Sequence, residues 1–403
     1  MKETKKGILM LASVASMIDL FNEDNISIME KLGCRIDVAA NFQEGSITSQ
    51  KRVDEYHDEL VERGIKVYDI PFPRSIFKIG QIVKSYMAVK KIARENKYVL
   101  AHVHSPIGGV VGRLALRKAR HNNTKVIYTA HGFHFFDGAP LLNWLVYYPI
   151  ERLCAHFTDV IITINQEDYR RASGWNVCEV KYVPGIGVDT QVAIISAEER
   201  RRVREEFGFT DRDFVFMSTG QVSVRKNHEV IIKALSKIDD PSVKYLIVGF
   251  GEEEARLKQM AKALGVEQRV VFAGYRGDVK QLLKVVEAFA FPSLQEGLPV
   301  ALMEAMAAGL PIVCSRIRGN VDLVEDGQGG YLFDAHDTDG FVSGMRKIIT
   351  NANASKMGLI NEQMIKKFDR NVVSEYMERI YSELMGGGKT VVSISQACYA
   401  KAA

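Results

Sequence analysis

Strand-like and helix-like stretches alternate along most of this chain of 403 residues. Apolar runs such as 7–13 and 98–104 have the length of buried strands, and a stretch with helical spacing follows each. Such alternation is typical of βαβ units, in which helices cover both faces of a parallel sheet. The pattern starts again at 214–219 and continues through 245–248. We therefore expect an α/β protein with a parallel sheet in each half.

The length of the chain also indicates two domains, because a single hydrophobic core rarely extends beyond about 300 residues. A charged helical stretch begins at 197, shortly after the sequence Pro184-Gly-Ile-Gly-Val-Asp189, which places the linker near 186–197. The last 18 residues begin with three glycines and lack periodicity, so we expect them to be disordered. In chain order we predict a first domain at 1–188, a second domain at 189–370, an amphipathic helix at 371–385 and a disordered tail at 386–403.

The N-terminal residues have two interpretations. Lys5 and Lys6 precede a short apolar run, as in a secretory signal, but the same run suits a first buried strand whose removal would cost the sheet a strand. We prefer the strand. No run approaches the ~18 apolar residues of a transmembrane helix. The five cysteines form no C-x-x-C pair, which suits a reducing compartment, so we expect a cytoplasmic protein.

Positive charge is concentrated in one part of the first half. The net charge of the whole chain is +4, yet residues 74–125 contain twelve Lys and Arg residues and one acid, Glu95. Nine of these twelve basic residues fall on two predicted helices, 81–97 and 109–120. A basic amphipathic surface attracts anionic lipid, so we predict peripheral binding to the inner face of the cell membrane. A solvated helix face and a nucleic-acid patch are the alternatives, and the scarcity of interleaved aromatic residues disfavours nucleic acid.

Polar side chains stand where several strands of the first half end. Ser13, His104, His131 and Asn165 each occupy such a position. In parallel sheets the carboxyl ends of the strands border the ligand crevice, so these four residues are candidates for substrate binding. A lone histidine can equally be a satisfied structural residue, and His104 can simply cap its strand.

In the second half, residues 291–309 (FPSLQEGLPVALMEAMAAG) combine a strand end, a turn and a helix. Proline suits a first helical turn, so the helix is predicted to begin near Pro299, and Gly309 is predicted to close it as a left-handed cap. The N-terminus of a helix favours an anionic ligand. Glu296 and Glu304 could accept hydrogen bonds from the hydroxyls of one polyol. The alternative is a buried helix with one solvated and one capping glutamate.

Residues 220–227 form a second candidate for anion binding. Gly220 follows a predicted strand, and Arg225 and Lys226 stand at the mouth of the next helix. A phosphate there would meet backbone N–H groups, the helix dipole and a fixed cation. The spacing alone is weak, because a solvated Lys-Arg pair would give the same sequence.

Two short motifs suggest chemistry that we do not expect. Gly249-Phe-Gly251 lacks the third glycine of a dinucleotide fingerprint, so no nicotinamide cofactor is predicted. Asp211-Arg-Asp213 could hold a metal in another setting, but it precedes a strand and is typical of a solvated turn. We therefore predict neither a metal site nor a cofactor.

These motifs together resemble a known family. Glu296 and Glu304, within EGLPVALMEAMAAGLPIVCS, are similar to the E-x7-E signature of family 4 (group 1) glycosyltransferases, which have the GT-B fold of two Rossmann-like domains facing across a cleft. Lys226 matches the lysine of the family's phosphate-binding G-R-x4-K, but Gln221 replaces the usual arginine. The runs HSPIGGVVGRLALRKAR and YTAHGFHFFDGAPLLNWLVYYPIER resemble the bacterial capsule and exopolysaccharide subgroup. The resemblance covers roughly residues 5–385.

The resemblance implies the activity and the roles of single residues. It implies a hexosyltransferase that moves a sugar, with retention, from an NDP-sugar (UDP-linked by expectation) to a polyprenyl-diphosphate-linked acceptor, with the helix at 371–385 crossing back to the first domain. His131, Glu296 and Lys226 are the implied catalytic residues, and Ser13, His104 and Asn165 lie on the acceptor side. The implied donor contacts are Gly220, Gln221, Arg225, Lys226, Gly249, Gly274, Tyr275, Glu296, Gly297, Leu298, Pro299 and Glu304.

Two other functions remain open from the sequence: a UDP-sugar epimerase of the same fold, and a non-catalytic scaffold protein in polysaccharide assembly. The sequence does not identify the sugar, the base, the acceptor or the oligomeric state.

Overall fold

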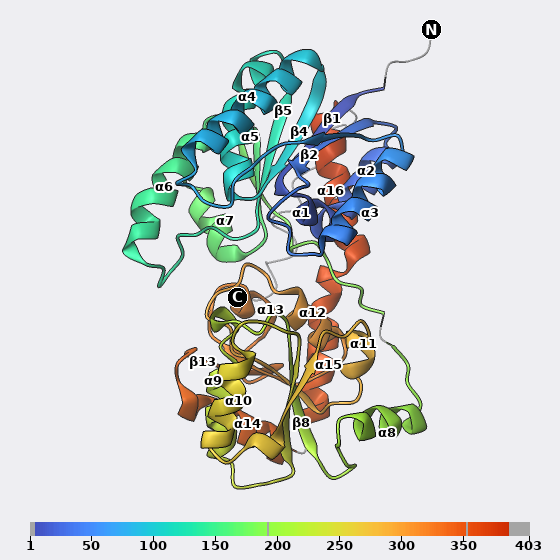
Figure 1. Ribbon diagram of the computed structural model, residues 1–403, viewed down its shortest axis with the longest axis vertical. Coiled ribbons are helices and arrows are strands. Elements are labelled where there is room, and N and C mark those ends of the chain that lie inside the picture. The colour runs from blue at the N-terminus through green and yellow to red at the C-terminus, as the bar shows by residue number, and fades with distance from the viewer. Residues whose placement is uncertain (1–4, 192, 352–353, 387–403) are drawn as a thin grey trace. The chain divides into compact units, whose positions relative to one another are not determined.

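The computed structural model describes residues 5–191, 193–351 and 354–386, and the tail that we expected to be disordered lies, from residue 387 on, outside these ranges (Figure 1). The chain forms two compact units. Of the described residues, the first unit contains 5–163, Tyr169–Val183 and 373–386, and the second contains Ile164–Asp168, 184–191, 193–351 and 354–372. The short segment Ile164–Asp168 thus packs with the second unit although the chain on both sides of it belongs to the first.

The first unit is built on a seven-stranded sheet with the order β3-β2-β1-β4-β5-β6-β7, and every pairing between its described strands is parallel. The strands are β1 (Gly7–Val14), β2 (Arg35–Asn41), β3 (Lys66–Asp69), β4 (Tyr98–His104), β5 (Lys125–Ala130), β6 (Val160–Thr163) and β7 (Glu179–Tyr182). The N-terminal apolar run is therefore β1, a central strand.

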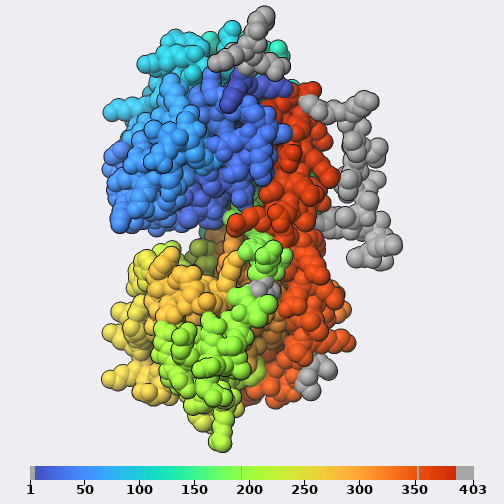
Figure 2. Space-filling model, turned by 90° about the vertical axis from the view of Figure 1, so that its right-hand side faces the viewer, coloured from blue at the N-terminus to red at the C-terminus, as the bar shows by residue number. Residues whose placement is uncertain are grey.

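Helices cover both faces of this sheet. Successive residues of β1 point to opposite faces, so Ile8 and Met10 join one core while Leu9 and Leu11 join the other. The first core is covered by α1 (Ala15–Phe21), α2 (Glu23–Lys31), α3 (Gln50–Glu62) and α16 (Arg370–Leu384), and the second by α4 (Ile79–Glu95), α5 (Pro106–His121) and α6 (Leu141–Ala155). The outer sides of the early helices, in blue, and of α16, in red, form part of the surface of this unit in Figure 2.

The second unit repeats the plan with a six-stranded parallel sheet of order β10-β9-β8-β11-β12-β13. Its strands are β8 (Phe214–Thr219), β9 (Val243–Val248), β10 (Val270–Gly274), β11 (Ala288–Phe291), β12 (Ile312–Ser315) and β13 (Gly330–Phe333). Its helices are α8 (Ala197–Glu206), η1 (Val224–Lys226), α9 (His228–Ser236), α10 (Glu254–Ala263), η2 (Glu267–Arg269), α11 (Val279–Leu282), α12 (Val300–Ala307), α13 (Asn320–Leu323), α14 (Thr338–Thr350), α15 (Ala354–Ile365) and η3 (Lys366–Phe368). Helix α7 (Gln166–Ala172) begins in this unit and ends in the first.

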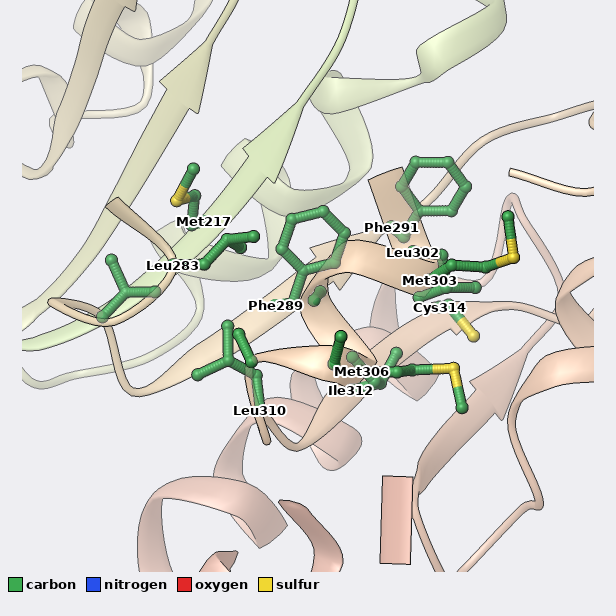
Figure 3. Close-up of a cluster of buried hydrophobic side chains, with 14 of the residues drawn as sticks. Met217, Leu283, Phe289, Phe291, Leu302, Met303, Met306, Leu310, Ile312 and Cys314 are labelled. Carbon is green, nitrogen blue, oxygen red and sulfur yellow. The ribbon is translucent and has the colours of Figure 1, made fainter. Parts of the chain in front are cut away.

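The core beneath α12 fixes the position of this helix, which carries Glu304. Leu302, Met303 and Met306 are fully buried against Phe289 of β11 and Ile312 of β12, as Figure 3 shows. A fully buried apolar side chain of this size contributes about 1.5–3 kcal/mol of transfer free energy. The helix therefore has little freedom to shift relative to the sheet.

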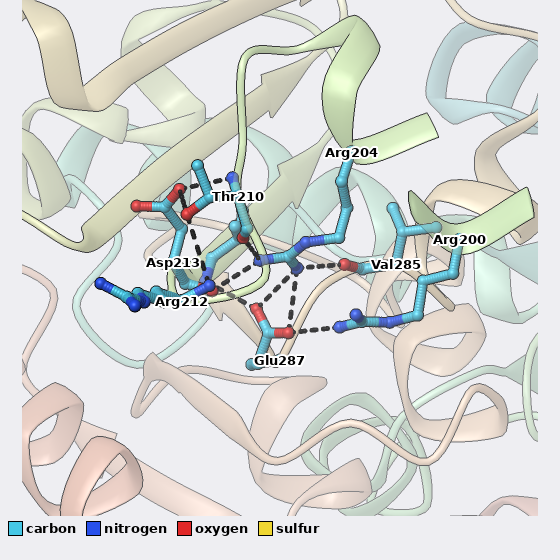
Figure 4. A network of polar contacts seen from close by, with 8 residues as sticks. Arg200, Arg204, Thr210, Arg212, Asp213, Val285 and Glu287 are labelled. Atoms are coloured by element: carbon cyan, nitrogen blue, oxygen red, sulfur yellow. Dashed lines mark hydrogen bonds and ion pairs between the residues drawn. The ribbon is translucent and has the colours of Figure 1, made fainter. Parts of the chain in front are cut away.

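Helix α8 is held by a buried arginine rather than by apolar contacts alone. Arg204 Nη1 donates to Val285 O at 2.6 Å and to Glu287 Oε1 at 3.0 Å, and its Nη2 donates to the carbonyls of Thr210 and Asp213 (Figure 4). Asp213 also accepts hydrogen bonds from the N–H and hydroxyl of Thr210, at 2.6 and 2.8 Å. The triplet Asp211-Arg-Asp213 thus forms a turn that is closed by its own side chains.

The predicted α/β fold with two parallel sheets is confirmed. Within the described residues, no helix is both long and apolar enough to cross a bilayer. In the same ranges, no cluster of three or more His, Cys, Asp or Glu side chains is arranged to hold a metal ion.

Candidate active site

Two loops of the second unit meet at one carboxylate. Lys226, which ends the short helix η1 after β8, places its Nζ 2.8 Å from Oε1 of Glu296, and Arg225 places its Nη1 at 2.8 Å from the same oxygen. Arg225 also donates to Gln295 O at 2.9 Å, and its own carbonyl accepts from Leu294 N–H at 2.8 Å. The two loops are therefore joined by main-chain and side-chain contacts, and the predicted phosphate-binding lysine and sugar-binding glutamate lie together.

Burial sets the electrostatics of Lys226. Its side chain is 10% exposed, and its ammonium group lies 4.6 Å from the centre of the Phe291 ring. Desolvation lowers the pKa of Lys226, and the neighbouring Glu296 carboxylate partly offsets this effect. A poorly solvated ammonium group gains more from an added anion than an exposed one does. The local chemistry thus suits a ligand with several negative charges.

Glycines allow the loop after β8 to approach its neighbours. Gly220 has φ +131°, and a β-carbon there would lie 3.1 Å from Lys226 Cε. Gly249, after β9, has φ +140°, and a β-carbon at this position would collide with Gly220 O. Gly249 therefore packs closely against the Gly220 loop, and the nucleotide contact predicted for it stays a prediction.

Asn227 is a site-building residue that sequence reasoning did not single out. It adopts the left-handed conformation with φ +54°, and its side-chain amide donates to Pro292 O at 3.0 Å and Ala335 O at 2.8 Å. Asparagine tolerates this conformation better than most residues. Its position directly after Lys226 was the one available signal, because an Asn at a turn into a helix is favoured there.

Helix α12 begins at Val300, in agreement with the predicted start near Pro299. Pro299 is the N-cap with an extended backbone (φ −80°, ψ 117°), and Val300 is the first helical residue. The N-cap has no side-chain hydrogen bond to the first turn. Gly309 has φ +75°, as expected of a left-handed residue that closes a helix. Gly297 and Leu298 form the turn that leads into α12.

Glu304, in the second turn of α12, lies beside a small pocket of the same unit. Asp189, Gln191, Lys280 and Leu283 also line this pocket. Burial raises the pKa of Glu304, and Lys280 lowers it to a smaller extent. Lys280 Nζ lies 2.6 Å from Asp189 Oδ2, so the principal cation near Glu304 already has a partner.

Other predicted donor contacts lie at or just after the ends of strands β8, β9 and β10, and their exposure differs. Gly249 N–H donates to Gly274 O at 2.8 Å, which ties the loops after β9 and β10 together. Tyr275 is 80% exposed. Gln221 is exposed, and its amide donates to Glu252 Oε2 at 3.3 Å.

In the first unit, three histidines form one cluster. His104 Nδ1 lies 3.2 Å from His131 Nε2, and the rings of His102 and His104 are 4.0 Å apart. His102 bonds to Tyr381 Oη at 2.8 Å and to Thr129 Oγ1 at 2.7 Å. Sequence reasoning missed His102, although its spacing of two from His104 on a strand places both side chains on one face.

Burial keeps these histidines neutral near pH 7. Burial lowers the pKa of His131 to about 4. It also lowers the pKa of His102 to about 3, and the repulsion that protonated His102 would meet from protonated His131 adds to this effect. The pKa of His104 lies well below its ordinary value for the same reasons. The cluster can therefore donate or accept hydrogen bonds without carrying charge.

The other two acceptor-side candidates have structural contacts. Ser13 Oγ accepts from Gly108 N–H at 2.8 Å, which holds the start of α5 against the end of β1. Asn165 is fully buried, and its amide donates to Asp168 Oδ2 at 2.9 Å within the segment that packs with the second unit. Neither the catalytic roles nor the acceptor roles of these residues are tested by this geometry, and they stay predictions.

Two family models match the chain. Residues 199–365 match the model described as glycosyl transferases group 1, and residues 46–165 match glycosyl transferase 4-like. A Bacillus subtilis (strain 168) protein named glycosyltransferase EpsD is 34% identical over 386 residues, which cover 94% of this chain and 97% of that protein. An Escherichia coli UDP-Gal:α-D-GlcNAc-diphosphoundecaprenol α-1,3-galactosyltransferase is 27% identical over 72% of this chain and 76% of its own length.

A solved structure shares the fold. HepE from Anabaena, crystallised with UDP and glucose, superposes with a TM-score of 0.75 at 22% identity, over 94% of this chain and 100% of that chain. Two parallel α/β units of this kind define the GT-B fold. Within that fold class, the chain belongs to the group 1 glycosyltransferases. The family and the fold inferred from the E-x7-E signature are confirmed.

Proposed function

We propose that this protein is a retaining hexosyltransferase that moves a sugar from a UDP-sugar to a polyprenyl-diphosphate-linked acceptor during exopolysaccharide or capsule synthesis. The observation that carries the proposal is the meeting of Lys226, Arg225 and Glu296 at one point of the second unit, next to the start of α12. Two cations and a helix N-terminus suit a diphosphate, and a carboxylate between them suits sugar hydroxyls.

Each residue has a role in this proposal. Lys226 and Arg225 bind the diphosphate and stabilise the charge that collects on it as the glycosidic bond to the donor breaks. Preorganised cations are most effective against charge that develops in the transition state. Glu304 accepts hydrogen bonds from the ribose hydroxyls, Glu296 accepts them from the donor sugar, and His131 contacts the transferred sugar. The two cations provide the stabilisation that a metal ion provides in other transferases, so we propose a metal-independent reaction.

The substrates and ligands of related proteins support the choice of substrates. The E. coli relative carries UDP-Gal and a diphosphoundecaprenol-linked sugar in its name, and HepE has been crystallised with UDP, with UDP and glucose, and with UDP-glucose. For this chain, we propose the corresponding classes: a UDP-linked hexose as donor and a lipid-linked saccharide as acceptor.

A lipid-linked acceptor requires access to a membrane, and we propose that the basic region 74–125 provides it as a peripheral contact with an anionic surface. Helix α4 supports this idea because its outer side carries apolar residues beside exposed lysines. Ile79, Val83 and Met87 are spaced by four residues and are 69, 53 and 56% exposed, and Lys84 and Lys91 flank them. Such a mixed apolar and basic face is typical of helices that lie in a membrane interface.

Helix α6 supports the same proposal. It belongs to the same helical layer as α4, and Leu141, Leu142, Leu145 and Leu153 are each more than half exposed. Both helices follow strands of a parallel sheet, so their first turns lie at its carboxyl edge, where His104 and His131 also lie.

A panel of nucleotide sugars tests the proposed reaction. We expect one UDP-sugar to stabilise the protein in a thermal-shift assay and then to release UDP in the presence of a polyprenyl-diphosphate-linked acceptor. Because the proposed mechanism retains configuration, an α-linked donor should give a product whose NMR coupling constant reports an α-linkage. A β-linked product would exclude retention, conversion of UDP-GlcNAc to its epimer without acceptor would indicate an epimerase, and no binding of any uridine nucleotide would indicate a scaffold.

Vesicle co-sedimentation tests the membrane contact separately. The Lys84→Gln/Lys91→Gln variant should bind anionic vesicles more weakly than the wild type. A control double variant, Lys51→Gln/Lys258→Gln, removes two exposed lysines from α3 and α10 and should bind as the wild type does. Equal binding of the wild type to neutral and anionic vesicles would refute the basic surface.

A further inference from the structure

A buried arginine of the second unit contacts the main chain of the proposed sugar-binding glutamate. Arg318 lies in the loop between β12 and α13, and its side chain is 4% exposed. Its Nε donates to the carbonyl oxygen of Glu296 at 3.1 Å, and its Nη1 donates to Asp168 Oδ1 at 3.0 Å. The guanidinium group therefore joins two segments that are separated by more than a hundred residues.

Asp168 provides the countercharge and is itself fixed. It is fully buried, and its second carboxylate oxygen accepts from Asn165 Nδ2 at 2.9 Å. The N–H of Asp168 donates back to Asn165 Oδ1 at 2.8 Å. The N–H of Gln166 donates to Asp322 Oδ2 in α13 at 3.0 Å. Segment Ile164–Asp168 is thus attached to the Arg318 loop through Asp168 and to helix α13 through Gln166.

The same loop also packs directly against the turn after Glu296. Gly319 has φ +82°, and a β-carbon at this position would collide with Gly297 O. Arg318 and Gly319 therefore contact the main chain at Glu296 and Gly297. Arg225 and Lys226 contact the Glu296 carboxylate.

We infer that Arg318 is a positioning residue for the donor sugar: charge-neutralised by Asp168, it fixes the backbone of Glu296 so that the carboxylate meets the sugar hydroxyls. The inference rests on the proposed function, because it assigns the role to the glutamate that is proposed to bind the donor sugar. Arginine suits this position because its rigid planar group directs two separate nitrogens, Nε and Nη1, at the two acceptors. Lysine would keep the charge, but its single nitrogen cannot reproduce the geometry of both contacts.

Matched substitutions at the two arginines of this loop test the inference. Arg318→Lys should weaken the binding of UDP-glucose by about tenfold or more, the loss expected for one hydrogen bond to a charged donor. Binding of UDP, which has no sugar, should change by less than about threefold. Arg316→Lys is the control, because this side chain is 52% exposed, pairs with Asp326 and should leave both affinities unchanged. Calorimetry with the full chain measures all four values.

Amide hydrogen exchange provides a readout that does not depend on any ligand. In Arg318→Lys, exchange should increase in the peptide that contains Gly297 and Leu298, and in Arg316→Lys it should not. Asp168→Asn is a second variant that leaves Arg318 in place without its countercharge, and it should raise exchange in the same peptide.

Three results would contradict the inference in different ways. Unchanged exchange and unchanged UDP-glucose affinity in Arg318→Lys would show that Arg318 does not position Glu296. Equal losses of UDP and UDP-glucose affinity, together with a lower melting temperature, would show a general structural role instead. A wild-type protein that binds neither probe would refute the proposed function and the inference with it, whatever the exchange data show.

Discussion

Lys226 and Glu296 form an ion pair in which Nζ and Oε1 are 2.8 Å apart and each side chain is 10% exposed. Because Arg225 shares the same carboxylate oxygen, one negative charge faces two positive charges, and the group keeps a net positive charge. A diphosphate would complete the neutralisation and release Glu296 for hydroxyl groups. This relationship has consequences for pH dependence and for the effects of substitutions.

The affinity for UDP should fall as the pH rises toward the alkaline range. Desolvation lowers the pKa of Lys226 below its ordinary value of 10.5, and a bound diphosphate would raise it again. Binding is therefore coupled to proton uptake once the free protein begins to lose this proton. Calorimetry between pH 7 and 10 should show the decrease, and Lys226→Arg, which stays charged, should flatten it. A constant wild-type affinity over this range would contradict the assignment.

We expect Arg225 to make the diphosphate contact that, in the family, an arginine at the position of Gln221 usually makes. Arg225 reaches Glu296, whereas Gln221 is exposed and reaches Glu252. We expect Arg225→Gln to reduce kcat/KM for the donor by roughly 10- to 100-fold, as for the loss of one contact to a charged group. Gln221→Ala should change it by less than about twofold. Steady-state kinetics with the donor found in the panel decides the order of the two effects.

The stability of the first unit should depend on one buried ion pair. Arg113 is fully buried, lies 2.7 Å from Glu151 Oε2 and stacks 3.8 Å from the centre of the Tyr128 ring. Arg113→Met leaves Glu151 without this partner and should lower the free energy of unfolding by about 3–5 kcal/mol. The exposed Arg117 provides the control, since Arg117→Met should cost about 0.5 kcal/mol or less.

Tryptophan fluorescence can follow this unfolding selectively. The chain has two tryptophans: Trp175 belongs to the core of the first unit, and the partly buried Trp144 packs against the same core. Urea titration of the full-length variants should therefore report the first unit. A loss for Arg113→Met no larger than that for Arg117→Met would contradict the role of the pair.

The histidine cluster should make the first unit sensitive to acid. Burial lowers the pKa of His131 to about 4 and that of His102 to about 3, whereas unfolded histidines titrate near their ordinary value of 6.5. The unfolded state thus binds more protons between these values, so stability should fall as the pH decreases from 6.5 toward 4. Removing one member by His104→Leu should reduce the slope, and His121→Leu, at an exposed position, should not. An unchanged slope in His104→Leu would contradict the coupling.

Local pattern was sufficient to predict the fold and the place of Lys226 in the loop after β8. Strand and helix periodicity predicted the two parallel sheets, and the glycine at 309 predicted the end of α12. The spacing of Gly220 and Lys226 after β8 predicted that Lys226 lies in the loop that begins at Gly220. Local pattern was enough here because the two residues are close in sequence.

The contacts that organise the site over long distances could not be predicted in this way. Arg318 and Asp168 are 150 residues apart, and neither has a motif of its own. Their pairing depends on segment Ile164–Asp168 packing with the second unit, which no helical or strand periodicity encodes. The exposure of Val83 and Met87 on α4 could not be predicted either, since apolar residues on a helix are normally expected to face the core.

The most direct test of the account is the turnover of Lys226→Ala with its donor and acceptor. We predict that kcat falls by about 10²–10³-fold, the usual loss for one group that stabilises developing charge, while the melting temperature stays close to that of the wild type. If this variant turns over at the wild-type rate, the diphosphate does not bind at Lys226 and the proposed site is wrong.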